Sequence, residues 1–567
     1  MGGAWAQTPT PPANGNGDVD TPYIITKAEE LAWFRNQVNG GKNKICAKIA
    51  DNVEVIDLKD FCHAEDVSQN LKELSWVPIG TANKPYQGTF DGNNKTITNL
   101  YIKTKTAQNN VGFFCMTRGA TIQDLIFDNA KVENVSTTYT KALCTGILAG
   151  YAYADTNSPS HIKGIKTTKN CTVIGQNDTG GIVGNASNIN LENCENRSSV
   201  KGESYVGGIA GDYSYKNIKR CTNYGTVETV KNNSQRTGGI IGYANGTSIE
   251  DCANYGKLTS KGWYYGGIAG EMRGNSSIQN VFSYGDMTYT YAPGIIIGYV
   301  DRTSTLTAKG IVAYNKEVLQ NNSSENIKIV GTGSLTFEDG KVEADVVKAF
   351  TLEQIKSGEV AYLLNGSTSE GELAWYQKLG TDAYPVLTAT KGNTVYNGSF
   401  RYCDNTAASY SNSTSEDVLV HQMSATLASP EHDADEHIYH MGCRNEGCTQ
   451  HKYVADKAGN IVVTKDENSK FVATDDLTLA DGEDFKDYET FTSKTISYSR
   501  NIPEGAAWGT LCLPFAIDLS QVAECDFYRL TGIDAANKCI TLESYEGTEI
   551  PAGTPVLFKM KEGETSL

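Results

Sequence analysis

The chain has 567 residues, enough for several domains, and carries a formal net charge of −17 with only 20% charged residues. This acidic balance, without any run of Lys or Arg, argues against nucleic acid or an anionic membrane surface as a partner. No apolar run of about 18 residues is present, so the sequence predicts no membrane span. Fifty-six glycines and 31 tyrosines against seven methionines favour turn-rich β structure.

Residues 1–20 are expected to be a leader. The first six residues, MGGAWA, end in a small-x-small pattern that is typical of a signal-peptide cleavage site, with Gln7 as the first mature residue. An ordinary disordered N-terminus is the alternative. Residues 7–20 are rich in Pro, Gly, Asn and Thr, which favours disorder. We therefore expect an exported protein, either secreted or on the cell surface.

Residues 21–85 are expected to form an N-terminal cap. Thr26-Lys27-Ala28-Glu29 has the spacing of a capping box, and Leu31, Phe34 and Val38 share one face of the helix that follows. Gly40-Gly41 ends this helix. Because an open first coil of a β structure exposes both core and strand edge, we expect the helix to act as a lid.

A repeat occupies most of residues 86–340. Its glycine-rich phrase ends in Gly residues that fall 27, 31, 28 and 28 residues apart. Each phrase is followed by a short β-branched stretch, with no helical spacing of apolar residues. The phrases read TGGIVG at 179–184, VGGIAG at 206–211, TGGIIG at 237–242, YGGIAG at 265–270 and APGIIIG at 292–298.

Units of this length fit the coils of a parallel β-helix, in which equivalent residues stack at roughly 4.8 Å. Two columns follow from the register. An inward column contains Cys194, Cys221 and Cys252 with Val281 after them, and these cysteines are expected to be buried and free. A column of amides contains Asn196, Asn223 and Asn254, ended by Ser283.

The sequence therefore predicts a mainly β protein. We expect a right-handed parallel β-helix with an N-terminal capping helix, followed by smaller, sandwich-like β domains. The right hand follows from the crossover rule for parallel strands.

Tyrosines are the candidate ligand-binding residues. One row follows the amide column and is expected to point outward, and further tyrosines follow the glycine phrases. A Tyr ring offers a flat face to a sugar and a hydroxyl for hydrogen bonds. The alternative is structural, because stacked aromatic rings stabilise neighbouring strands. The candidates are Tyr213, Tyr224, Tyr243, Tyr255, Tyr284 and Tyr299.

No catalytic residue is predicted. An HExxH helix, a GxSxG elbow and a P-loop are absent from the sequence. Carboxylates shortly after the glycine phrases, Asp212, Glu271 and Asp301, are interpreted as solvated turn residues rather than as a catalytic set.

The pattern GG-I-x-G followed by I-x-x-C-x-N-x-G-x-V resembles the GLUG repeat. That repeat occurs in surface proteins of Gram-negative gut-type bacteria, mostly regarded as adhesins, and beside the catalytic part of IgA-cleaving metallopeptidases. Residues 76–101 are similar to the start of many such β-helices. The resemblance implies architecture and adhesion, and it implies no peptidase activity here because the peptidase motif is missing.

Residues 341–400 are similar to segments that follow such β-helices and are expected to form a C-terminal cap or linker. Residues 401–470 are rich in Cys and His. His440, Cys443, Cys448 and His451 have a spacing that fits a structural zinc site. The alternative is a Cys443–Cys448 disulfide, which export favours. The sequence indicates no other cofactor.

Residues 471–567 alternate polar and apolar positions and are expected to form a β-sandwich-like domain, incomplete because the chain stops soon after a strand. It resembles segments near the C-termini of the same class of surface protein.

The expected function is that of a monomeric, non-enzymatic surface protein. Its expected role is adhesion, through binding of a glycan or a host or cell-surface protein on the exposed β-helix face. A polysaccharide lyase or glycoside hydrolase on the same scaffold is the alternative. Two carboxylates in a groove on adjacent coils favour the enzyme, whereas a Tyr strip without them favours binding.

Overall fold

The computed structural model describes the chain except residues 1–7, 66–71, 105–109, 136–142, 156–159, 290–293, 320–327, 389–391, 403–405, 414–438, 443–450, 455–460, 469, 482–490, 504–505 and 565. The chain forms two compact units. One contains residues 1–398 and 409–415, and the other contains residues 399–408 and 416–567. Among the described residues, no helix is long and apolar enough to cross a membrane.

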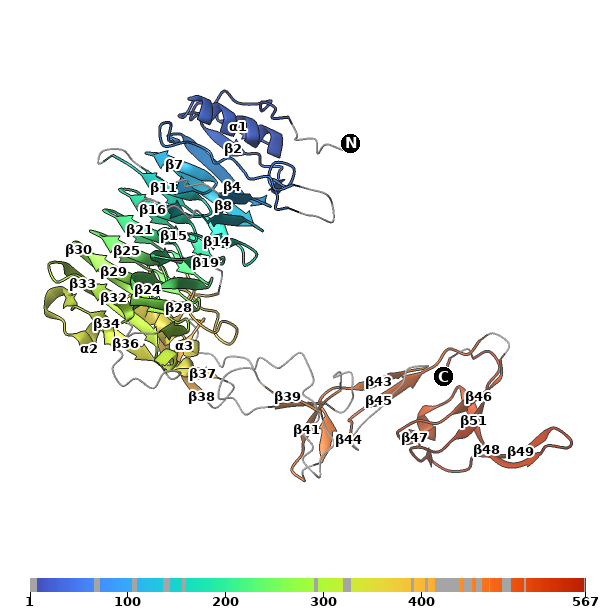
Figure 1. The fold of residues 1–567 in the computed structure, drawn as a ribbon. Helices are drawn as coiled ribbons and strands as arrows, with labels where there is room; N and C mark the ends of the chain where they lie inside the picture. The colour runs from blue at the N-terminus through green and yellow to red at the C-terminus, as the bar shows by residue number, and fades with distance from the viewer. Residues whose placement is uncertain are drawn as a thin grey trace. The chain divides into compact units, whose positions relative to one another are not determined.

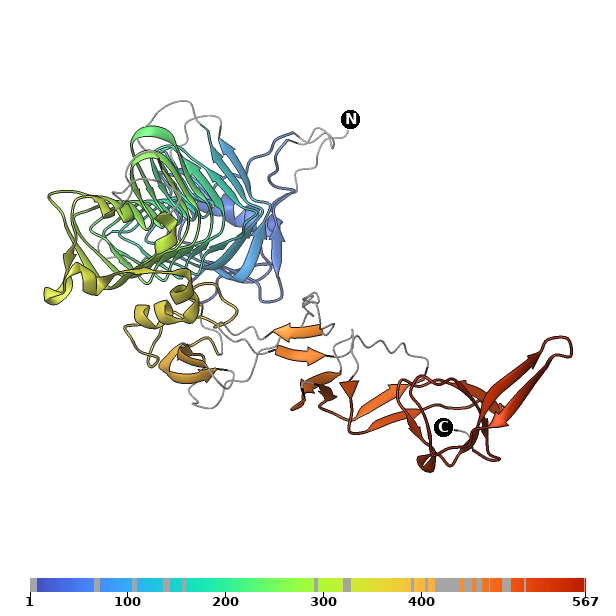
Figure 2. The ribbon, with the colours of Figure 1, turned by 90° about the horizontal axis from the view of Figure 1, so that it is seen from below.

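The first unit is a parallel β-helix (Figure 1). Its coils alternate between a 17-stranded sheet, which includes β1 (Tyr23–Ile25) and β36 (Val347–Phe350), and a 19-stranded sheet. Figure 2 shows the coils from a second direction. The mainly β fold class predicted from the sequence is confirmed, and the parallel ladder begins earlier and ends later than the expected 86–340.

The central coils share one pattern of strands. In the 19-stranded sheet the successive coils contribute β14 (Thr172–Ile174), β15 (Asp178–Gly180) and β16 (Val183–Ser187); then β19 (Ser199–Gly202), β20 (Tyr205–Gly207) and β21 (Ala210–Ser214); then β24 (Val227–Gly238) and β25 (Ile241–Asn245); then β28 (Leu258–Gly266) and β29 (Ala269–Arg273); then β31 (Met287–Tyr289) and β32 (Gly294–Val300).

The facing 17-stranded sheet takes two short strands from each of these coils. They are β17 (Asn190–Glu192) with β18 (Glu195–Asn196), β22 (Asn217–Lys219) with β23 (Thr222–Asn223), and β26 (Ser248–Glu250) with β27 (Ala253–Asn254), followed by the longer β30 (Asn275–Ser283) and β33 (Thr305–Asn315). Asn188 and Asn193 have positive φ at the bends before and after β17, where a short polar side chain tolerates the left-handed backbone.

Each glycine phrase makes a tight corner inside the 19-stranded sheet. At the corner, the strand after the phrase approaches the strand that begins the phrase of the preceding coil. The two backbones come close because glycine has no side chain. A Cβ atom on Gly211 would lie 2.3 Å from the Thr179 main-chain nitrogen of the preceding coil. Only glycine allows this approach, which explains why all five phrases end in glycine.

The amide column exists as predicted. Asn196 Nδ2 donates to Asn223 Oδ1 and Asn223 Nδ2 donates to Asn254 Oδ1, each over 2.8 Å. All three side chains are fully buried, and Ser283 follows in register. The column begins one coil earlier at Thr167, whose hydroxyl donates to Asn196 Oδ1 over 2.8 Å. Stacked amides therefore satisfy one another inside the core.

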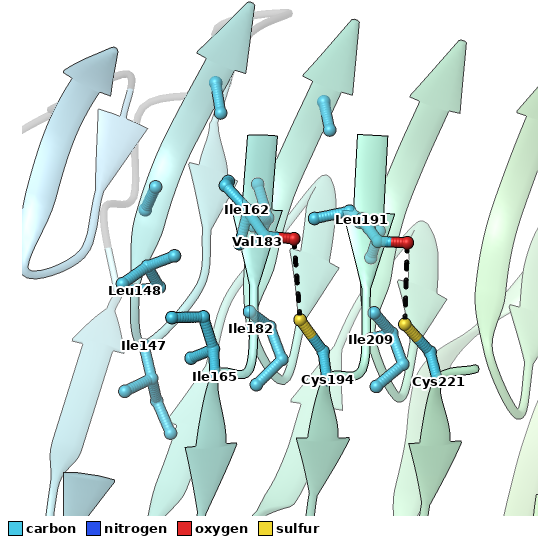
Figure 3. Packing of buried hydrophobic residues seen from close by; sticks show 14 of the residues in the cluster. Ile147, Leu148, Ile162, Ile165, Ile182, Val183, Leu191, Cys194, Ile209 and Cys221 are labelled. Carbon is cyan, nitrogen blue, oxygen red and sulfur yellow. Dashed lines mark hydrogen bonds between the residues drawn. The ribbon is translucent and has the colours of Figure 1, made fainter. Parts of the chain in front are cut away.

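The inward cysteine column is also confirmed. Cys194, Cys221 and Cys252 are buried and free. Figure 3 shows the Cys194 and Cys221 thiols among buried Ile, Leu and Val side chains, directed at the carbonyl oxygens of Ile162 and Leu191. Burial raises the pKa of the Cys221 thiol well above its ordinary value, so these thiols behave as small apolar side chains.

Helix α1 (Ala28–Gly40) covers the first coil as expected (Figure 1). Leu31, Phe34 and Val38 are fully buried beneath it, and Gly41 ends the helix in the left-handed conformation. The predicted capping box is wrong, because Lys27 occupies the N-cap position without a side-chain bond. Thr26 instead donates its main-chain N–H and its hydroxyl to the Glu30 carboxylate, over 2.7 and 2.9 Å.

The expected disorder of the leader is wrong for residues 8–20. Asn14 accepts a main-chain hydrogen bond from Ile24, and Thr10 donates one to the Glu29 carbonyl. Backbone pairing thus orders a segment whose composition favours disorder. Residues 1–7, with the predicted cleavage site, lie outside the described residues.

Three short helices follow the last coils: α2 (Glu343–Val346), α3 (Leu352–Ser357) and α4 (Glu359–Leu364). A cluster of buried side chains from α3, α4 and the segment after them, with Trp375 fully buried, packs on Ala253, Phe282 and Ala313 of the β-helix. Residues 341–398 therefore cover part of the β-helix surface.

The second unit consists of small separate sheets. Strands β46 (Trp508–Leu511), β51 (Val556–Met560), β48 (Cys525–Asp534) and β49 (Cys539–Ser544) form an antiparallel sheet, beside the pair β47 (Ile517–Asp518) and β50 (Glu549–Ile550). A five-stranded sheet contains β39 (Tyr439–Gly442), β40 (His451–Val454), β41 (Val462–Lys465), β42 (Phe471–Ala473) and β44 (Phe491–Thr492). The smaller β regions expected after the β-helix are present.

Replacing Asn223 by Ala is expected to destabilise the β-helix by about 1–3 kcal/mol, because Asn196 Nδ2 and Asn254 Oδ1 each lose a buried partner. Urea denaturation followed by circular dichroism measures the change. Asn217→Ala, at an exposed position on the same coil, serves as the control. Equal stability of the two variants would contradict the role of the column.

Gly211→Ala is expected to cost about 3 kcal/mol or more, because the new methyl group meets the main chain of the preceding coil. The matched control is Gly40→Ala, where no atom lies within 4 Å of the added Cβ. Thermal unfolding separates the two. A Gly211→Ala protein as stable as Gly40→Ala would show that the corner is not tight.

Candidate functional site

The six predicted tyrosines lie in three different environments. Tyr213 is fully buried in the core, with its hydroxyl bonded to the carbonyl oxygens of Ile189 and Asn217. It faces inward because it is the second residue after the glycine corner, and side chains alternate along the strand. Tyr213 is therefore absent from any exposed surface.

Tyr224, Tyr255 and Tyr284 form the predicted row outside the β-helix core, but the row is not open. Tyr384 from the C-terminal cap stacks on Tyr255 with ring centroids 4.2 Å apart, and it lies 4.9 Å from the Tyr284 ring. The Tyr255 hydroxyl donates to the Pro385 carbonyl oxygen. The row is therefore not fully exposed as expected: Tyr384 and Pro385 cover part of it, and its three rings stay partly exposed.

Tyr243 and Tyr299 lie on a different surface, at the glycine corners of the 19-stranded sheet. They belong to a column formed by the residue directly after each closing glycine. A second column is formed by the residue two positions before each glycine pair. The first column is Asn185, Asp212, Tyr243, Glu271 and Tyr299, and the second is Asp178, Tyr205, Arg236 and Tyr264.

The two columns face each other across the corner. Tyr205 stacks on Tyr243 with ring centroids 5.3 Å apart, and Tyr264 lies against Tyr299 at 4.5 Å. The Arg236 guanidinium lies between the rings of its own column, 5.0 Å from Tyr205 and 5.3 Å from Tyr264. These contacts are stabilising cation–π and aromatic geometries. All of these rings remain partly exposed. We call Tyr205, Arg236, Tyr264, Tyr243, Glu271 and Tyr299 the corner strip.

Glu271 holds the corner strip together. Its carboxylate is fully buried and pairs with Arg236 through one oxygen and with Arg273 through the other. The Arg273 side chain is 42% exposed, so one guanidinium stays accessible at the surface. Two cations on one carboxylate leave a local positive charge in an acidic protein.

Asp178 and Asp212 lie at the other end of the same columns, on adjacent coils. Asp178 is buried and accepts hydrogen bonds from Asn185 Nδ2 at 2.8 Å and from the Cys144 thiol at 3.4 Å. Burial, together with the neighbouring Asp178 charge, raises the pKa of Asp212 to about 8. At neutral pH this pair therefore offers a protonated carboxyl beside a second acid, which is an arrangement capable of proton transfer.

The interpretation of the carboxylates as solvated turn residues is wrong for two of the three. Asp212 and Glu271 share one column and are largely buried, whereas Asp301 hydrogen-bonds only to Thr303 of its own turn and is solvated as expected. Asp212 and Glu271 were assigned to turns because a sequence phrase does not reveal that its two strands fold against each other.

Sequence reasoning missed Tyr205, Arg236, Tyr264 and Asp178. A signal was available, because each stands two residues before a Gly-Gly pair. Alternation places that residue on the same face as the one after the closing glycine.

Two of the four predicted zinc ligands lie outside the described residues, so the zinc site stays a prediction. His440 lies in β39 and His451 in β40, which pair antiparallel. Cys443 and Cys448 lie outside the described residues. Within the described part of the chain, no group of three or more His, Cys, Asp or Glu is placed to hold a metal ion.

Asp212→Asn is expected to make stability less dependent on pH. The raised pKa of Asp212 means that its contribution is fully present below about pH 4 and is lost as pH rises towards 8. The variant should therefore gain stability over the wild type between pH 4 and 9, on the order of a few kcal/mol. Thermal unfolding at several pH values measures this gain.

Asp301→Asn is the control for that experiment. Hydrogen bonds from Thr303 lower the pKa of Asp301, so this variant should show no gain at high pH. Parallel curves for the wild type and Asp212→Asn would contradict the buried, protonated carboxyl.

Comparison with known proteins adds little to this geometry. No family model and no curated protein matches the chain. Among solved structures, the chain is similar to a protein from Bacteroides ovatus that is described as a putative immunoglobulin A1 protease. The identity is 22% and the TM-score 0.42, over 66% of this chain and 95% of that chain. This similarity is too low to support an argument about activity.

Proposed function

We propose that this protein is an exported, surface-associated bacterial protein of the GLUG-repeat kind that binds a glycan without cleaving it. The observation that carries the proposal is the corner strip. It places four partly exposed tyrosine rings and Arg236 on a regular surface of the β-helix, with Arg273 paired to its Glu271.

The chemistry of the strip suits carbohydrate. A tyrosine ring offers an apolar face for the C–H side of a sugar, and its hydroxyl bonds to sugar hydroxyls. Arg273, with its exposed guanidinium, adds donors for hydroxyl or acidic groups of the chain.

The strip is also rigid, which lowers the entropic cost of binding. Its rings stack in pairs, and its arginines are fixed by the buried Glu271. Because the side chains repeat with the coils at about 4.8 Å, the strip fits an extended chain better than a compact ligand.

The Asp178–Asp212 pair supports a second candidate, a polysaccharide-degrading enzyme. Two coupled carboxyl groups on adjacent coils, one of them protonated at neutral pH, are the groups that a glycoside hydrolase uses. Both acids are largely buried, however, and Asp178 already accepts two hydrogen bonds. Restricted access favours binding over catalysis.

A glycan array with the purified protein tests the proposal. The double variant Tyr264→Ala/Tyr299→Ala should lose at least about tenfold in affinity for any glycan found, because the aromatic contact surface is removed. Tyr215→Ala, at a tyrosine that is 55% exposed on the same β-helix, is the control and should bind normally.

Release of reducing ends from the bound glycans is measured in parallel. No release is expected. Release that disappears in Asp212→Asn would replace the binding function with the enzymatic one, and unchanged affinity in the double variant would reject the strip.

A further inference from the structure

A pocket of about 440 Å³ lies where the Tyr224–Tyr255–Tyr284 row reaches the end of the β-helix, beside Leu352 of α3. Its volume falls in the range of ligand sites in proteins. Its side chains come from the last coils and from α3. None of the lining residues belongs to the corner strip. The lining includes Tyr255, Tyr284, Lys257, Asp286, Asn315 and Glu317.

The aromatic wall of the pocket is held in place. Tyr384 packs on both Tyr255 and Tyr284, and the Tyr255 hydroxyl is bonded to the Pro385 carbonyl. Tyr284, by contrast, has a hydroxyl without a partner among the described residues. A fixed pair of rings with one free hydroxyl is suited to recognition rather than to packing alone.

Asn315 supplies an unpaired donor. It is only 7% exposed, and its Oδ1 accepts the Glu317 main-chain N–H over 3.0 Å. Its Nδ2 has no hydrogen-bond partner in the described part of the chain. The N–H groups of this amide are free to donate to an oxygen atom of a ligand in the pocket.

The rim is charged but unpaired. Lys257, Asp286 and Glu317 are all exposed, and the described residues provide no ion-pair partner for any of them. Lys257 and Asp286 directly precede the neighbouring strands β28 and β31, since Leu258 and Met287 are in register and the Leu258 N–H donates to the Asp286 carbonyl. The rim therefore offers both donors and acceptors, with one negative charge in excess.

These features narrow the class of ligand. Two carboxylates disfavour an anion and the polar rim disfavours an apolar molecule, while Lys257 offsets one of the two negative charges and leaves a cation as the rival that the test includes. A ring face, an amide donor and carboxylate acceptors together match the C–H face and hydroxyl groups of a neutral sugar. We propose that this pocket binds a neutral hexose unit, as a site separate from the corner strip.

The test uses the full chain and a panel of D-glucose, D-galactose, D-mannose, N-acetylglucosamine, lactose and cellobiose, with glucuronate and arginine as charged probes. Saturation-transfer NMR detects binding, and calorimetry measures affinity. We expect one or more neutral sugars to bind below about 10 mM and the charged probes to bind more weakly.

Two variants of the pocket should weaken that binding at least about tenfold. Asp286→Asn/Glu317→Gln removes strong acceptors at exposed positions and should leave the fold intact, while Tyr284→Ala removes the ring face. Glu353→Gln, an exposed acid on α3 outside the pocket lining, is the matched control. Thermal unfolding confirms that each variant is folded.

Three results would overturn the proposal: no neutral sugar binds at 10 mM, arginine binds in preference to sugars, or affinity is unchanged in both pocket variants. The corner-strip variant Tyr264→Ala/Tyr299→Ala should keep the sugar affinity of the pocket. Failure at one site is thus distinguishable from failure at the other.

Discussion

Parallel hydrogen bonding in register between successive coils is the constraint on which the rest of this structure depends. It places every side chain against its counterpart one coil away, at about 4.8 Å. Amides profit from this arrangement, because Asn223 both accepts from Asn196 and donates to Asn254. Carboxyl groups do not profit from it. Burial, together with the neighbouring Asp178 charge, raises the pKa of Asp212 to about 8.

The glycine corners give the β-helix its candidate site. Because the strands on either side of a corner approach at backbone distance, the outward residues before and after the phrase meet in pairs. Aromatic rings stack there, and the buried Glu271 pairs with two arginines. The surface that results is polar, aromatic and stiff, and it repeats along the coils. Such a surface is better suited to hold an extended ligand than to perform chemistry.

The segment after α4 partly covers the row formed by Tyr224, Tyr255 and Tyr284. By packing Tyr384 and the Pro385 carbonyl on the row, it turns an exposed aromatic ladder into an interface within the unit. Beside Tyr255, Tyr284 and Asn315, a pocket with unpaired polar groups stays open. One row of like residues therefore serves packing at one end and is proposed to serve recognition at the other.

The sequence by itself determined the parallel β-helix, the amide and cysteine columns and the capping helix, because a repeat in register converts a sequence offset directly into a spatial neighbour. It also placed Tyr243 and Tyr299 after the glycine phrases, and their role in binding stays a prediction. Only the tertiary structure decided that Tyr213 is internal, that Tyr224 and Tyr255 are partly covered, and that Glu271 is fully and Asp212 partly buried. These outcomes depend on strands folding against each other at the corners and on a segment more than 100 residues away in the chain, and the period of a repeat encodes neither.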